Sequence, residues 1–139
     1  AVTCPEKCDC YLTTVNCKGR NLTSIPKDIP ISTKILYLGF NLLTSIEDKS
    51  FEKLTNLTEL YLNNNHICKV ANGAFYGLSS LKILSFTTNK LTSLSAKVLE
   101  DVSLLKELFL TNNDLVEIPN FASVTMKGLV QLNLNNNKL

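Results

Sequence analysis

The residues best suited to covalent chemistry lie at the start of the chain, where cysteine is concentrated. Four of the five cysteines fall within 14 residues, with the spacing C-x3-C-x-C-x6-C: Cys4, Cys8, Cys10 and Cys17. This density indicates an oxidising compartment and a small disulfide-linked subdomain. A zinc site would require paired C-x-x-C motifs, which are absent, so we expect no metal or other cofactor. The sequence alone leaves three disulfide connectivities open.

The remaining titratable residues do not predict an enzyme. His66, the single histidine, is close to Cys68 in the sequence, but a nucleophilic site also needs an orienting group and an oxyanion site. We expect Cys68 to be partly buried and inert, because free cysteine behaves as a small hydrophobe; an intermolecular disulfide is the alternative. Glu59 and Glu107 are too far apart in the sequence to indicate a carboxylate pair.

Charge and hydropathy exclude two further classes of partner. Fourteen basic and twelve acidic residues give a net charge of +2, and the basic residues show no clustering of the kind that binds phosphates. Nucleic acid is therefore not expected as a ligand. No apolar run approaches the length of a membrane span, so this segment is not expected to insert into a bilayer.

Most of the chain is built from one repeated unit. Five asparagines recur every 24 residues: Asn41, Asn65, Asn89, Asn113 and Asn137. Each stands in the same apolar frame, which in the second unit consists of Leu57, Leu60, Leu62, Asn65, Ile67, Val70, Phe75 and Leu78. Alternation in Leu-x-Leu turns both leucines inward from a short strand and the residue between them outward. A fixed period of this length predicts a solenoid, whose units bury their apolar faces only by stacking.

The frame resembles the leucine-rich-repeat pattern L-x-x-L-x-L-x-x-N-x-L. The resemblance implies an α/β-type solenoid that is mostly β, a right-handed arc with a parallel concave sheet and an irregular or 3-10 convex side. The repeats would span 33–56, 57–80, 81–104, 105–128 and, in part, 129–139. We expect the asparagine amides to satisfy backbone groups of the turns. Apolar bulk would return from the convex side at Phe51, Phe75 and Leu99.

The first 32 residues resemble the cysteine-rich N-terminal cap of extracellular leucine-rich-repeat proteins. That group includes the variable lymphocyte receptors of jawless vertebrates, Slit proteins, peroxidasin, Nogo-type receptors and decorin-type proteoglycans. The resemblance implies disulfides Cys4–Cys10 and Cys8–Cys17. We expect Val15 and Cys17 to point inward from a strand that pairs with the strand around Leu36, because the end of a solenoid must be covered.

The C-terminal part of the chain departs from the regular pattern. Ser123 stands where the earlier units have a large apolar residue, so we expect an irregular turn between Ile118 and Leu129, with Phe121, Val124 or Met126 filling the space. The chain stops at Leu139 within a repeat. Either it is truncated, or a partner or a second copy covers the edge near Leu132 and Leu134, which would allow self-association.

The outward residues of the strands are the candidate ligand-binding site. One column across the sheet contains three aromatic residues, which are typical interface anchors when exposed among polar groups. Cross-strand stabilisation of the sheet is the alternative explanation. The predicted concave site consists of Tyr37, Phe40, Glu59, Tyr61, Asn63, Ile83, Ser85, Glu107, Phe109 and Asn133.

These features predict an extracellular module, secreted or part of an anchored protein, that binds a protein or glycan ligand without chemistry. The likeness of the cap and first repeat to variable lymphocyte receptors implies an immune-type or cell-surface receptor. The alternative is a structural matrix protein of the small leucine-rich-proteoglycan type. Two N-x-T sequons, at Asn21 and Asn56, lie off the predicted strand face and allow glycosylation.

Overall fold

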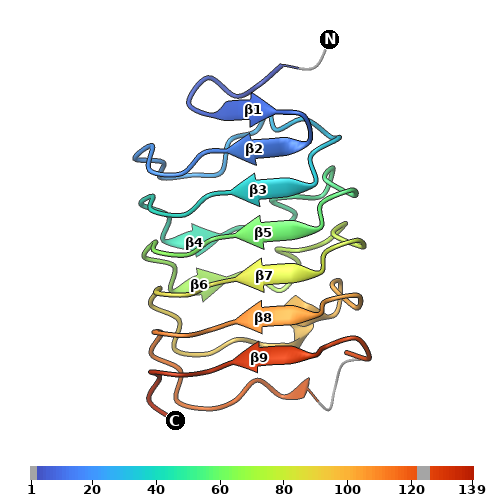
Figure 1. The fold of residues 1–139 in the computed structure, drawn as a ribbon. Coiled ribbons are helices and arrows are strands. Elements are labelled where there is room, and N and C mark those ends of the chain that lie inside the picture. Colours follow the sequence, from blue (N-terminus) through green and yellow to red (C-terminus); the bar gives the residue numbers. More distant parts are fainter. Residues whose placement is uncertain (1–2, 122–125) are drawn as a thin grey trace.

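The computed structural model, which describes residues 3–121 and 126–139, is a solenoid whose termini lie at opposite ends of the stack (Figure 1). Its main sheet has seven strands in the order β1-β2-β3-β5-β7-β8-β9. The first pair is antiparallel and every later pair is parallel. The strands are β1 (Asp9–Tyr11), β2 (Thr14–Asn16), β3 (Ile35–Tyr37), β5 (Glu59–Tyr61), β7 (Ile83–Ser85), β8 (Glu107–Phe109) and β9 (Gln131–Asn133). The solenoid predicted from the 24-residue period is confirmed.

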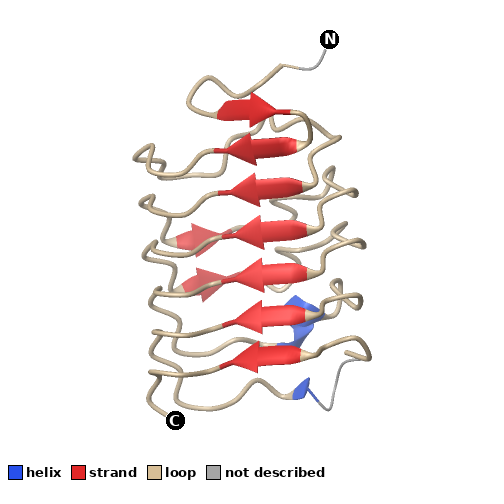
Figure 2. Cartoon of the chain, in the orientation of Figure 1, coloured by secondary structure: helices blue, strands red, loops and turns tan. Residues whose placement is uncertain are grey.

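The return path of each coil contains little regular structure. Strands β4 (Ser45–Ile46) and β6 (Lys69–Val70) form a parallel two-stranded sheet of their own. The 3-10 helix η1 (Ala96–Leu99) follows in the next coil, where the hydroxyl of Ser95 accepts a hydrogen bond from the amide of Lys97 at 3.2 Å. Figure 2 shows the main sheet on one side, and β4, β6 and η1 among loops away from it. A mostly β solenoid with an irregular or 3-10 convex side is therefore confirmed.

The core is a continuous spine of leucine and phenylalanine. The paired apolar residues at each inner strand, such as Leu60 in β5 and Leu62 just after it, have no exposed surface. From the convex side, Phe51 and Phe75 stack with ring centroids 6.2 Å apart. Phe75 also contacts Phe86, at 5.9 Å. The predicted convex contribution of phenylalanine is thus confirmed, because neighbouring coils bury what a single coil would expose.

The repeated asparagines form a buried hydrogen-bonded ladder. Asn89 is 4 % exposed, and its amide nitrogen donates to the carbonyls of Leu62 and Phe86, both at 2.9 Å. Its amide oxygen accepts from the backbone N–H of Ile67 at 3.0 Å. Asn65 donates to the same Leu62 carbonyl at 3.1 Å, so one carbonyl joins two coils. The predicted role of the asparagines in the turns is confirmed.

The residue before each of these asparagines adopts the left-handed conformation. The φ values lie between 55° and 58° at Phe40, Asn64, Thr88, Asn112 and Asn136. Asparagine tolerates this region because its short polar side chain can bond locally, whereas a β-branched residue is strained there. Thr88 is therefore the least suitable residue of this column.

Replacing Thr88 with asparagine should stabilise the protein by about 0.5–1 kcal/mol, because it relieves part of the strain at positive φ. The reciprocal variant, Asn112→Thr, should destabilise by a similar amount. Urea denaturation of both variants measures the two changes. A loss of stability in Thr88→Asn would show that its hydroxyl, which accepts from the Asn112 amide at 3.4 Å, outweighs the backbone strain.

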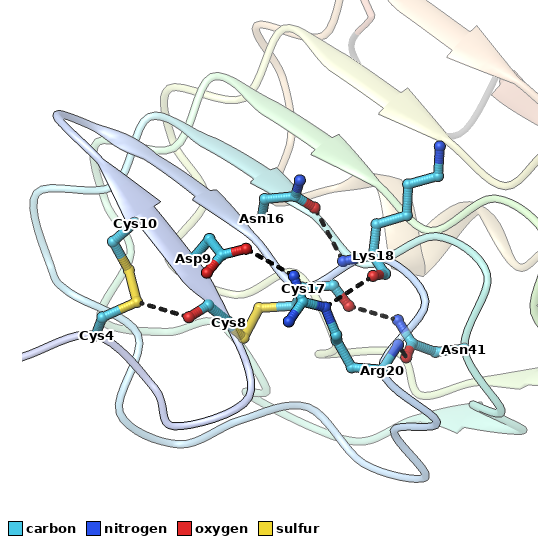
Figure 3. Close-up of polar contacts among 9 residues, drawn as sticks. All are labelled: Cys4, Cys8, Asp9, Cys10, Asn16, Cys17, Lys18, Arg20 and Asn41. Atoms are coloured by element: carbon cyan, nitrogen blue, oxygen red, sulfur yellow. Dashed lines mark hydrogen bonds and ion pairs between the residues drawn. A yellow bond between two sulfur atoms is a disulfide. The ribbon is translucent and has the colours of Figure 1, made fainter.

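Disulfides and the first repeat hold the cap (Figure 3). The bonds are Cys4–Cys10 and Cys8–Cys17, so the pairing implied by the family resemblance is confirmed. Val15 and Cys17 are buried, and Val15 pairs in register with Leu36. The Cys17 carbonyl accepts from the amide of Asn41 at 3.0 Å, which ties the cap to the asparagine ladder. Arg20 pairs with Asp9 at 2.7 Å on the surface.

The other end of the solenoid is more exposed. Leu132 of β9 is 36 % exposed and Val130 is 80 % exposed. Of the residues predicted to fill the irregular turn, Phe121 and Met126 pack against the core, half-buried. Ser123 and Val124 lie outside the described residues.

Candidate functional site

The outward side of the seven-stranded sheet, which we call the strand face, presents two columns of side chains in register. Pairing of β3, β5, β7, β8 and β9 aligns the first residues of the strands and, separately, the third residues. The first column is Ile35, Glu59, Ile83, Glu107 and Gln131. The second column is Tyr37, Tyr61, Ser85, Phe109 and Asn133. The structure therefore brings the predicted columns together, one residue per strand.

A stacked tyrosine pair dominates the N-terminal half of the strand face. The rings of Tyr37 and Tyr61 lie 5.0 Å apart at an interplanar angle of 15°, and both side chains are half-buried. The Tyr61 hydroxyl donates a hydrogen bond to the Glu59 carboxylate at 2.5 Å. Burial and this carboxylate raise the pKa of Tyr61 well above its usual value, so the phenol stays protonated. The pair is a rigid, amphipathic surface with one end polar.

Glu107 and Phe109 continue the strand face on β8. Both side chains are half-buried, and Glu107 adds to the negative potential that Tyr61 experiences. Across the described residues, ion pairs join only Arg20 with Asp9 and Lys138 with Asp114, so Glu107 forms no ion pair there. Ile83 lies between the two glutamates, in register with both. The centre of the strand face is therefore aromatic and acidic.

One predicted site residue is buried, and three others make local contacts. Ser85 is only 6 % exposed, and its hydroxyl bonds to Thr87, so it offers no contact surface, in contrast to the prediction. A small side chain between large neighbours on a sheet is covered by them. Phe40 is exposed but lies in the turn after β3, beneath the Lys18 ammonium at 5.0 Å. Asn63 and Asn133 use their amides within their own turns.

Cys68 is exposed, so the prediction that it is partly buried is wrong. Its thiol lies 3.6 Å from the Thr44 carbonyl, in a column whose other members, Thr44, Thr92 and Val116, are exposed as well. The position follows the inward Ile67 and therefore points outward. His66 is exposed too. Within residues 3–121 and 126–139, histidine, cysteine and carboxylates nowhere gather in a group that could hold a metal ion.

The structure also groups basic residues that the sequence reading treated as scattered. Lys82, Lys106 and Lys127 line one recess at the edge where β7 and β8 begin. Lys82 and Lys106 are separated by one 24-residue period, and this offset is the sequence signal that could have revealed them. The expectation that basic residues do not cluster is therefore wrong at this edge, because the period places residues far apart in the chain side by side.

Comparison with known protein families agrees with this architecture. Residues 31–90 and 55–115 match the family model described as "Leucine rich repeat". Residues 3–30 match "Leucine rich repeat N-terminal domain". The chain belongs to the leucine-rich-repeat family. Both matched parts are non-catalytic binding modules, and leucine-rich-repeat domains generally mediate protein–protein binding.

Related leucine-rich-repeat proteins are much longer than this chain. Human "Leucine-rich repeats and immunoglobulin-like domains protein 1" is 42% identical over 67 residues, which are 48% of this chain and 6% of that protein. "Leucine-rich repeat-containing G-protein coupled receptor 5A" of Xenopus laevis is 39% identical over 83 residues, 57% of this chain and 9% of the receptor. The chain thus spans a small fraction of these relatives, which are cell-surface proteins.

A solved leucine-rich-repeat structure superposes on most of the chain. The crystal structure of human 5T4 (Wnt-activated inhibitory factor 1, trophoblast glycoprotein) matches with a TM-score of 0.78 and 29% sequence identity. The match covers 94% of this chain and 53% of that one. In the described part of our chain, no helix combines the length and apolarity needed to cross a bilayer. A disulfide-linked cap is consistent with an extracellular location.

Proposed function

We propose that this chain is an extracellular recognition module that binds a protein or glycan ligand through its strand face. The observation that carries the proposal is the stacked pair Tyr37–Tyr61, half-exposed beside Glu59 on a face that the core does not use. Aromatic residues of this kind supply large contact area with little loss of side-chain entropy, and they are enriched among interface anchors.

The surroundings of the tyrosine pair support a contact surface. Glu107 and Phe109 extend it to β8, with β7 between β5 and β8, and the short parallel strands hold all of these side chains on a rigid base. Both sequon asparagines, Asn21 and Asn56, are exposed and lie outside the strands, so glycans there would leave the strand face open.

The family relationship favours a receptor. The relatives named above are cell-surface proteins, and the likeness of the cap and first repeat to variable lymphocyte receptors favours an immune-type or cell-surface receptor. A structural role in the extracellular matrix is the alternative. Ligand screening separates the two, since a matrix protein should bind fibrillar collagen and a receptor should bind other ectodomains or glycans.

The experiment is a binding screen with matched variants. A tetramerised form of the chain is applied to an array of secreted proteins, receptor ectodomains, glycans and fibrillar collagen, and each hit is measured by biolayer interferometry. Tyr61→Ser and Phe109→Ser should each weaken the binding of a true ligand by about 1–4 kcal/mol, because anchor residues dominate binding energy. Tyr37→Ser should behave similarly, since it removes one half of the stack.

Tyr76→Ser is the control, because Tyr76 is a tyrosine exposed on the return path of the coil, beside Lys49 and away from the strand face. It should leave the affinity unchanged. If all three strand-face variants fold and bind as tightly as the original chain, the ligand contacts another surface and the proposal fails.

A further inference from the structure

A second surface, separate from the strand face, is a basic recess at the edge where two strands begin. Its volume is about 470 Å³, within the range of roughly 300–1,000 Å³ that is common for ligand pockets. The lining residues are Lys82, Ser103, Leu104, Lys106, Lys127 and Gly128. We call this site the lysine recess.

The fold holds the lysines of the recess at fixed backbone positions. Lys82 and Lys106 each directly precede a strand, β7 or β8, and the register Ile83↔Glu107 makes them neighbours across the sheet. The Lys106 amide donates to the Lys82 carbonyl at 2.8 Å. The Lys106 carbonyl in turn accepts from the amide of Val130 at 2.9 Å. Because adjacent strands lie about 4.8 Å apart, the backbones from which the two lysine side chains start are neighbours.

The lysines of the recess form no ion pair with acidic residues in the described part of the chain. None of the three lysines takes part in an ion pair among the described residues, and no acidic residue lines the recess. Another recess, on the return path near β4, differs, because Glu47 and Glu52 line it together with its lysines. Three neighbouring cations repel one another in the free protein, and a bound polyanion would remove that repulsion.

We propose that the lysine recess binds a sulfated polysaccharide of the glycosaminoglycan type. The cap disulfides indicate an oxidising, extracellular compartment, in which such glycans are the ordinary polyanions. Single-stranded nucleic acid fits less well, because no aromatic side chain lines the recess for base stacking. An anionic membrane surface fits less well too, since basic lipid-binding segments carry about 4–8 clustered cations.

The test measures the affinity of the whole chain for a heparin hexasaccharide, by isothermal titration at about 0.15 M salt and at lower ionic strength. The triple variant Lys82→Gln, Lys106→Gln, Lys127→Gln should bind roughly ten-fold more weakly, as expected for three solvent-exposed charge contacts. The control variant Lys27→Gln, Lys53→Gln, Lys90→Gln removes the same charge elsewhere on the exposed surface. Its affinity for the hexasaccharide should fall by less than about two-fold. Binding to the original chain should also shift the amide resonances of Ser103 and Gly128, and desulfated heparin should bind far more weakly.

Each contrary outcome overturns the proposal. If the original chain does not bind the hexasaccharide, the recess is not a glycan site. If the control variant loses as much affinity as the recess variant, net charge and not the recess causes binding. A preference for single-stranded DNA or for phosphatidylserine vesicles over the hexasaccharide would assign the recess to another polyanion. Thermal unfolding of both triple variants confirms that they fold, and the strand face is untouched in either.

Discussion

Replacing Asn89 with alanine is expected to lower the free energy of unfolding by about 2–4 kcal/mol, because it leaves a buried backbone donor without a hydrogen-bond partner. The Ile67 amide donates to the Asn89 side chain at 3.0 Å, and both residues are buried, so bulk solvent does not reach this donor. The carbonyls of Leu62 and Phe86 each lose one of two side-chain donors. Denaturant unfolding followed by circular dichroism measures the change.

Two further asparagines make this prediction specific to the buried ladder. Asn137 makes the same bonds, to the Leu110 and Leu134 carbonyls and from the Leu115 amide, but it lies in the exposed last coil. Asn137→Ala should therefore cost clearly less, because water can reach the groups that it leaves. Asn72→Ala, at an exposed position, should change stability by less than about 0.5 kcal/mol. Equal losses at Asn89 and Asn72 would show that the ladder contributes nothing beyond a general effect of the substitution.

Removing the Cys8–Cys17 disulfide is the second large expected effect. The double variant Cys8→Ala, Cys17→Ala should destabilise the protein by about 2–5 kcal/mol, because the bond restrains the unfolded chain and its sulfurs fill the end of the core. Cys17 has no exposed surface, and its carbonyl accepts from Asn41. Loss of the bond should therefore loosen the contact between the cap and the first repeat. Thermal unfolding at matched concentration gives the change.

The Cys4–Cys10 disulfide serves as the internal comparison. Both of its cysteines are exposed, and the chain that it closes is shorter, with a sequence separation of 6 against 9. The two disulfides therefore differ little in the loop entropy that they remove from the unfolded chain. If the Cys8→Ala, Cys17→Ala variant loses more stability than the Cys4→Ala, Cys10→Ala variant, the additional loss measures core packing. If Cys4→Ala, Cys10→Ala destabilises as strongly, burial of Cys17 is not what makes the second bond important.

These effects indicate that stability and recognition use different side chains of the same repeat. Leucines and asparagines of each coil face the spine, and their number and spacing are fixed by stacking. The residues between the leucines face outward and carry no such constraint. Variants of Tyr61 and Phe109 should therefore alter binding without unfolding the chain, whereas variants of Asn89 should unfold it.

Most of the architecture could be predicted from the sequence. Alternation within Leu-x-Leu decides which side chains of a strand face inward, and the 24-residue period decides which strands are neighbours. Together they predicted the parallel register of Tyr37 with Tyr61 and the role of the asparagines in the turns. The disulfide pairing could not be derived in this way and was implied by the family resemblance of the cap.

Other properties of individual side chains were decided by neighbouring coils. Ser85 points outward by alternation, yet it is buried because larger side chains of adjacent strands cover it. Cys68 is exposed although free cysteine is usually buried, because its place in the turn faces away from the spine. The left-handed conformation at Thr88 follows from the shape of the turn and contradicts the preference of threonine itself.

The sequence by itself determined the coil, its period and the direction of each strand side chain, because these depend on local alternation and on a repeat that is visible in one dimension. Only the tertiary structure decided which outward residues remain accessible, and which charges meet. The exposure of Tyr61 and the grouping of Lys82 with Lys106 and Lys127 depend on contacts between coils. Side chains from different repeats become neighbours at the surface only when the coils stack.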